Sequence, residues 1–201
     1  MIFAQWDDPV VTPFATVARL QVQRSPLKPR PAGSGHYDPA PLLEVEALEV
    51  DERGCIGVLG DERIVDLHHA DHPASRNARL VNGLSVLPRA HYGQLRARYG
   101  PHLVDGVAGE NVLLDTEGPL TADDLGGQLW LELDGRPVEV TGAMAAPPCV
   151  EFSRWVLRRD DLEVDDELRV VLDDLDRGLR GFYLRPTGAG VLRPGARVWR
   201  A

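Results

Sequence analysis

The sequence predicts a mainly β protein, an antiparallel β-barrel of few and short helices. Short segments of alternating apolar residues are separated by frequent Gly- and Pro-containing turns, a pattern typical of antiparallel sheets. Strands do not alternate with long helices, and no G-x-G-x-x-G motif occurs, so a doubly wound nucleotide-binding fold is disfavoured. The 201 residues are enough for one domain, or for one domain with an ordered extension.

The N-terminal quarter of the chain predicts two strands joined by a long loop. Residues 14–23 and 42–50 alternate in polarity, and the segment 24–41 between them is rich in Pro, Gly and Ser. We therefore expect residues 1–41 to form an N-terminal strand and a Pro-rich loop packed on the barrel. Residues 42–201 are expected to form the barrel domain itself.

The rest of the chain predicts short strands with a single clear helix before residue 100. Helical spacing over 88–99 ends at Gly100-Pro101, and alternating residues around Asp134-Gly135 specify a tight hairpin. The acidic segment 160–176 predicts one helix, or a helix and a loop. The other expected strands are 55–59, 63–67, 128–133, 136–141, 181–185, a segment at Val191, and 197–199.

Composition excludes several classes of function. The net charge of −9 argues against binding to nucleic acid or to an anionic membrane surface. No run of eighteen apolar residues and no secretory signal is found, so we expect a cytoplasmic protein. Lys28, the only lysine, lies between two prolines, which makes a P-loop or a pyridoxal phosphate enzyme improbable.

Cys149 is the candidate reactive residue. Pro147 and Pro148 precede it, and Val150, Phe152, Trp155 and Val156 follow at helical spacing. Because Pro favours the first turn of a helix, we expect Cys149 at or near a helix N-terminus. The N–H groups and dipole there favour a thiolate, which attacks electrophiles, carries sulfur or binds a soft metal. A buried structural cysteine is the alternative.

A second candidate cluster is His68-His69-Ala70-Asp71-His72. Its spacing is similar to the H-x-H-x-D-H metal motif of metallo-β-lactamase-like hydrolases, but Leu67 occupies the first ligand position. A metal-dependent hydrolase using His68, His69, Asp71 and His72 is therefore the minor hypothesis. The alternative is a polar loop whose histidines form local hydrogen bonds.

Several segments together resemble the MOSC domain family, the domain found at the C-terminus of molybdenum cofactor sulfurases. They are the Gly60-Asp61 to Asp66 strand pair with its following loop, the Gly106 to Asn111 turn (G-V-A-G-E-N), Pro148-Cys149, and the Arg180-Gly181-Phe182-Tyr183 strand. The resemblance covers roughly residues 42–200. This chain has Ala146 where the family has an Arg, and Arg76, Arg154 or Arg180 could supply the missing charge.

The resemblance implies a β-barrel that binds the molybdenum cofactor, molybdopterin. It implies that Cys149 either carries sulfur as a persulfide or ligates molybdenum, and that His69 could carry protons. The implied cofactor contacts are Arg76, Asn77, Gly109, Glu110, Asn111 and Arg180. Glu110 and Asn111 could brace the pocket from behind or bind the pterin edge, or could merely satisfy the turn.

The implied activity is cofactor sulfuration or delivery, or the reduction of N-hydroxylated compounds, by a reductase or a sulfurtransferase-like protein. Its expected partners are a sulfur-donor or electron-transfer protein and a small-molecule substrate. A non-catalytic cofactor-binding module is the alternative within the same family. The residues alone do not separate these functions.

Overall fold

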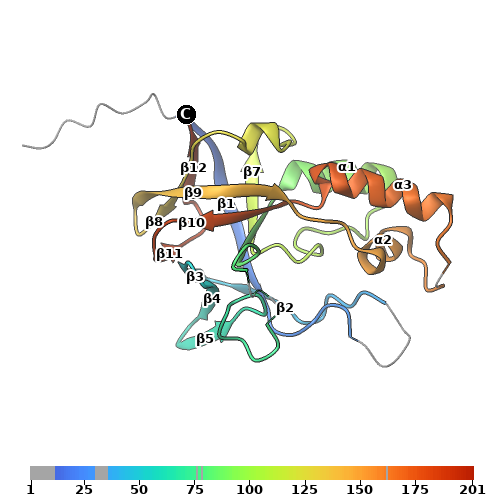
Figure 1. The fold of residues 1–201 in the computed structure, drawn as a ribbon, viewed down its shortest axis with the longest axis horizontal. Coiled ribbons are helices and arrows are strands. Elements are labelled where there is room, and N and C mark those ends of the chain that lie inside the picture. Colours follow the sequence, from blue (N-terminus) through green and yellow to red (C-terminus); the bar gives the residue numbers. More distant parts are fainter. Residues whose placement is uncertain (1–11, 30–35, 76, 78, 162) are drawn as a thin grey trace, which may run out of the picture.

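A closed ring of seven strands forms the centre of the fold in the computed structural model, which describes residues 12–29, 36–75, 77, 79–161 and 163–201 (Figure 1). The strands are β1 (Thr12–Gln23), β2 (Leu42–Val45), β3 (Ala47–Asp51), β4 (Gly54–Leu59), β5 (Glu62–Val65), β6 (Leu84–Pro88), β7 (Val112–Thr116), β8 (Leu129–Leu133), β9 (Arg136–Ala145), β10 (Phe182–Pro186), β11 (Gly190–Leu192) and β12 (Arg197–Arg200). The helices are α1 (Arg89–Tyr99), α2 (Val150–Leu157) and α3 (Asp166–Asp174), with short helical turns at Asp123–Leu125 and Leu175–Leu179.

The ring runs β12-β8-β9-β10-β6-β7-β1 and closes because β1 also pairs with β12. Its pairs are antiparallel except β6–β7, whose parallel pairing follows from the crossover through α1. The predicted β-barrel with a few helices is therefore confirmed, as a mixed barrel. The N-terminal strand β1 is itself one of the seven ring strands.

A second sheet of four strands, β11-β3-β4-β5, lies beside the barrel. The predicted strand 42–50 is divided at Glu46, because β2 pairs with β1 and β3 pairs with β4. The backbone N–H of Glu46 donates to the Val58 carbonyl at 2.9 Å, which ties the break to the second sheet. Apolar and polar residues continue to alternate across this position, so the change of sheet could not be predicted from the local pattern.

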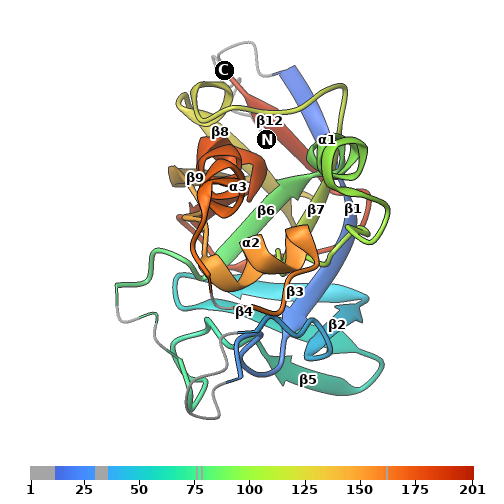
Figure 2. The same ribbon diagram turned by 90° about the vertical axis from the view of Figure 1, so that its right-hand side faces the viewer.

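Two apolar clusters hold the elements together. The first fills the barrel, where alternate residues such as Leu129, Leu131 and Leu133 of β8 are buried. The second lies under the three helices and includes Tyr92, Leu95 and Phe152. Figures 1 and 2 show these helices together at one end of the barrel. None of the helices that the structure describes is long and apolar enough to span a membrane.

Candidate functional site around Cys149

Cys149 is the N-cap residue of α2, as the two prolines predicted. Its backbone is extended (φ −131°, ψ 147°), and its carbonyl accepts hydrogen bonds from the Ser153 amide at 3.0 Å and hydroxyl at 2.9 Å. Cys149 is partly exposed, whereas Cys55 is completely buried in the barrel. Burial, with the nearby Asp66 and Asp51 carboxylates, raises the pKa of the Cys55 thiol well above its usual range. Cys149 is therefore the thiol of this protein that reagents can reach.

Arg180 supplies positive charge beside Cys149. It precedes β10, and its guanidinium carbon lies 4.8 Å from the centre of the Phe152 ring on α2. Burial lowers the pKa of Arg180, whereas the nearby ionised forms of Tyr37 and Cys149 raise it. The net shift of this pKa is upward. Within the described part of the chain, its buried Nε has no hydrogen-bond partner. A half-buried arginine, whose buried Nε has no hydrogen-bond partner among the described residues, thus lies near Cys149.

Tyr37 is a site residue that sequence reasoning missed. It comes from the Pro-rich loop, its ring centre lies 5.0 Å from that of Phe152, and its hydroxyl donates to the Val107 carbonyl at 2.7 Å. Burial raises the pKa of Tyr37 above its usual range, and the Arg180 charge partly opposes this shift. A loop without periodicity carries no signal that one of its aromatic residues is buried against a distant helix.

Glu110 and Tyr92 form a buried acid–phenol pair next to the group formed by Cys149, Arg180 and Tyr37. The Tyr92 hydroxyl accepts from the Ala108 amide at 2.9 Å and donates to Glu110 Oε2 at 2.8 Å. Among the described residues, Glu110 Oε1 has no hydrogen-bond partner. Burial raises the pKa of Glu110 to about 7, although the Tyr92 hydroxyl and the charges of Arg180 and Arg19 lower it. Glu110 therefore exchanges its proton near neutral pH.

Asn111, the next residue, braces the turn. Its Oδ1 accepts from the Ser85 amide at 3.0 Å and hydroxyl at 2.9 Å, and its Nδ2 donates to Asp66 at 3.1 Å and to the Gln21 carbonyl at 3.3 Å. All four hydrogen-bonding positions of the amide are thus used inside the protein. Gly109 has φ +82°, and a Cβ there would lie 2.7 Å from Leu27 Cδ1. The turn thus allows the Pro-rich loop to approach closely.

The other predicted contacts lie in the loop after β5. His69 is buried, its Nδ1 accepts from the Asp71 amide at 3.1 Å, and it packs against Gly54. Asn77 is buried and donates to the His68 carbonyl at 2.9 Å. Arg76 lies outside the described residues. In the described chain, no hydrogen bond, ion pair or ring contact joins His69 to Cys149, and its role as a proton carrier stays a prediction.

The histidine-rich cluster of the hydrolase hypothesis is held by contacts within its loop, by the Arg53–Asp71 ion pair and by His72, whose Nε2 lies 3.3 Å from the Arg24 carbonyl. His68 lies against Asp66, with Nδ1 at 3.3 Å from Oδ1, and His72 Nδ1 accepts from the Ala74 amide at 3.1 Å. Across the residues with described positions, no three His, Cys, Asp or Glu side chains are grouped so that they could hold a metal ion. This geometry gives no support to a metal-dependent hydrolase.

Comparison with known proteins decides the family. The MOSC domain family matches residues 74–199, more than half of the chain. The chain belongs to the MOSC domain family. No curated protein matches it.

Solved structures agree with the fold of this MOSC protein. It is similar to YuaD from Bacillus subtilis, with a TM-score of 0.57 and 12% identity over 94% of this chain and 96% of that one. It is also similar to YiiM from Escherichia coli (TM-score 0.50, 14% identity, 96% and 70% covered) and from Geobacillus stearothermophilus (TM-score 0.50, 17% identity, 93% and 75% covered). At these identities the likeness concerns the fold.

The MOSC protein lacks the family's arginine before the cysteine, and its structure shows what lies there instead. Ala146 is buried, and its amide donates to the Gly181 carbonyl at 2.8 Å. This bond joins the end of β9 to the residue that follows Arg180. Of the three candidates to supply the missing charge, Arg180 interacts electrostatically with Cys149.

Proposed function

We propose that this MOSC protein binds the molybdenum cofactor and uses Cys149 as a sulfur carrier or as a molybdenum ligand. The observation that supports this best is the association of a reachable thiol at a helix N-cap with a half-buried arginine, Arg180. The thiolate is a soft ligand of the kind that molybdenum and sulfur transfer require. The activity proposed is cofactor sulfuration or delivery, or the reduction of N-hydroxylated compounds.

The residues present fit such a group. The cofactor is anionic, and Arg180 offers a half-buried positive charge whose buried Nε has no hydrogen-bond partner among the described residues. Glu110 Oε1 is likewise a buried polar atom without a partner among the described residues. When bound, the cofactor would supply two-electron redox chemistry. Arg180 would attract its anionic part, and Cys149 would provide the sulfur ligand.

For a reductase, the protein's own groups would manage protons. Converting an N-hydroxyl compound to an amine breaks the N–O bond and consumes two electrons and two protons, releasing water. An electron-transfer protein would provide the electrons. Glu110, with a pKa of about 7, would hold one proton near the site, and Tyr92 fixes the orientation of its carboxyl group.

For a sulfur carrier, the same thiol would act as a nucleophile. The Cys149 thiolate would attack the outer sulfur of a donor protein's persulfide, whose S–S bond breaks as the donor leaves as a thiolate. Cys149 would then carry the outer sulfur as a persulfide. Arg180 would stabilise the anionic sulfur in both states.

The test compares the wild-type protein with Cys149→Ser after production in a host that makes the cofactor. We expect iodoacetamide to label the native wild-type protein once, at Cys149, and the variant not at all. We expect Cys149→Ser to lose bound molybdenum, or to lose sulfur that cyanide releases as thiocyanate, together with reductase activity. Cys55→Ala is the control and should keep all of these. Unchanged molybdenum, sulfur and activity in Cys149→Ser would refute the proposal.

A further inference from the structure

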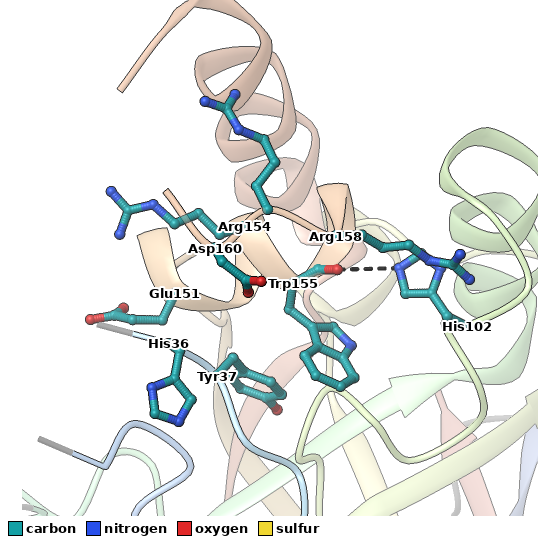
Figure 3. Close-up of a pocket in the computed structure, with 9 residues that line it drawn as sticks. His36, Tyr37, His102, Glu151, Arg154, Trp155, Arg158 and Asp160 are labelled. Carbon is teal, nitrogen blue, oxygen red and sulfur yellow. Dashed lines mark hydrogen bonds between the residues drawn. The ribbon is translucent and has the colours of Figure 1, made fainter. Parts of the chain in front are cut away.

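A hollow of about 520 Å³ lies along α2 (Figure 3). Trp155 lines it from the helix, Tyr37 from the Pro-rich loop, and His102 from the segment after α1. Its volume is within the range of roughly 300–1,000 Å³ that small-molecule sites occupy. Cys149 is not among its lining residues, so the hollow is distinct from the site of the thiol.

Two aromatic rings form one wall of the hollow. The ring centres of Tyr37 and Trp155 lie 5.8 Å apart, with the planes tilted by 55°. Tyr37 is buried and fixed in position, because its ring packs edge-on against Phe152 and its hydroxyl donates to the Val107 carbonyl. Trp155 is only partly buried, so a face of its indole is open to a ligand. Such a wall can stack a planar ring.

Trp155 also offers a polar group to a ligand. Its Nε1–H is buried and has no hydrogen-bond partner among the described residues. The indole nitrogen is a donor only, so what it lacks is an acceptor. His102 is fixed nearby, since its Nε2 lies 3.2 Å from the Trp155 carbonyl and 3.1 Å from the Val156 carbonyl. An acceptor group on a ligand could reach the indole Nε1–H after a small rotation of the ring.

The charge of Arg159, at the edge of the hollow, is already compensated. Its guanidinium lies 2.8 Å from Asp161, 2.6 Å from Asp165 and 3.6 Å from Glu167. Three carboxylates thus surround this one cation, and a ligand anion would meet their negative charge.

The remaining charges around the hollow favour neither sign. Glu151 lies 4.0 Å from the Lys28 ammonium, and Figure 3 shows its carboxylate directed away from the rings of Tyr37 and Trp155. Arg154 is buried and has contacts of its own within the protein. The exposed side chains of Arg158 and Asp160 contribute one charge of each sign. An ion that entered the hollow would therefore find little net charge to compensate it.

We propose that this hollow binds an uncharged planar aromatic compound with a hydrogen-bond acceptor, such as an aryl ketone. Its ring stacks against Trp155 and Tyr37, and its acceptor receives the indole Nε1–H of Trp155. Ions of the same shape bind more weakly, because burying a charge without a partner is costly. The site does not depend on the proposed cofactor chemistry.

The test is an NMR titration of the whole chain with ¹⁵N-labelled tryptophan. Acetophenone is the uncharged probe, and benzoate and benzylamine are anionic and cationic compounds of similar size. We expect acetophenone to bind at least about tenfold more tightly than either ion and to shift the indole N–H signal of Trp155. Acetone should not bind, because it has the acceptor but no ring. Equal or tighter binding of either ion, or an unshifted Trp155 signal at saturation, would overturn the proposal.

Two variants remove the same ring at different places. Trp155→Leu should weaken acetophenone binding about tenfold in calorimetry, while Trp199→Leu, on β12 of the barrel wall, should leave it unchanged. Arg158→Gln should also leave it unchanged, because the ligand has no charge to pair with this side chain. Cys149→Ser should bind acetophenone like the wild type, which separates this proposal from the proposed function. Equal losses in Trp155→Leu and Trp199→Leu, or a loss in Arg158→Gln, would contradict the assignment of the site.

Discussion

Replacing Gly181 with Ala is expected to destabilise the protein by about 3 kcal/mol, with loss of the geometry around Arg180. Gly181 has φ +93°, and a Cβ there would lie 2.5 Å from the Val86 carbonyl oxygen and 3.2 Å from Leu87 Cδ1. The contact is with the backbone of β6, which cannot move without disturbing the β10–β6 pairing. The measurement is the free energy of unfolding from urea denaturation.

Gly195 provides the matched control for this substitution. Its φ is +85°, and a Cβ there would meet nothing within 4 Å. Gly195→Ala thus introduces backbone strain without a clash and should cost about 1 kcal/mol. If the two variants lose the same stability, close packing at Gly181 does not matter and the explanation is wrong.

Replacing Glu110 with Gln is expected to stabilise the protein at alkaline pH and to flatten its pH dependence. Burial raises the pKa of Glu110 from 4.5 to about 7 in the folded state. Below pH 4.5 the carboxyl is protonated in both states and has no effect. Between pH 4.5 and 7, Glu110 is ionised in the unfolded chain but still protonated in the folded protein. The free energy of unfolding of the wild-type protein therefore falls as the pH rises.

The size of this effect follows from the shift. Each pKa unit corresponds to about 1.4 kcal/mol. The free energy of unfolding of Glu110→Gln should therefore exceed that of the wild type by about 3 kcal/mol near pH 8 and equal it near pH 4.5. Urea denaturation of both proteins across this range measures the difference. Glu62→Gln, at an exposed position, is the control and should follow the wild-type curve. A constant difference between Glu110→Gln and wild type at all pH values would contradict the prediction.

The barrel and the position of Cys149 could be predicted because both depend on local pattern. Alternation such as that of Leu129, Leu131 and Leu133 identifies the face of a strand that is buried. The two prolines and the spacing of Phe152 and Val156 identify the start of α2. These signals are contained within a few residues of the chain.

The neighbours of Cys149 could be predicted only in part because they come from distant segments. Arg180 was among the candidates through the family resemblance, but its stacking on Phe152 depends on how α2 and β10 pack. Tyr37 lies in a Pro-rich loop, and Tyr92 occupies a helix position typical of any core aromatic residue. The proton-holding property of Glu110 arises from burial beside Tyr92, which the G-E-N motif alone does not reveal.

The pairing of β1 with β12 has a consequence for how the protein is made. The ring can close only after residues 197–200 have left the ribosome, since they pair with residues near the beginning of the chain. Until then the nascent polypeptide would expose the free edges of β1 and β8, which are open to pairing with other chains. The barrel should therefore complete its folding only once residues 197–200 are available, and aggregation should be most acute when synthesis stalls before them.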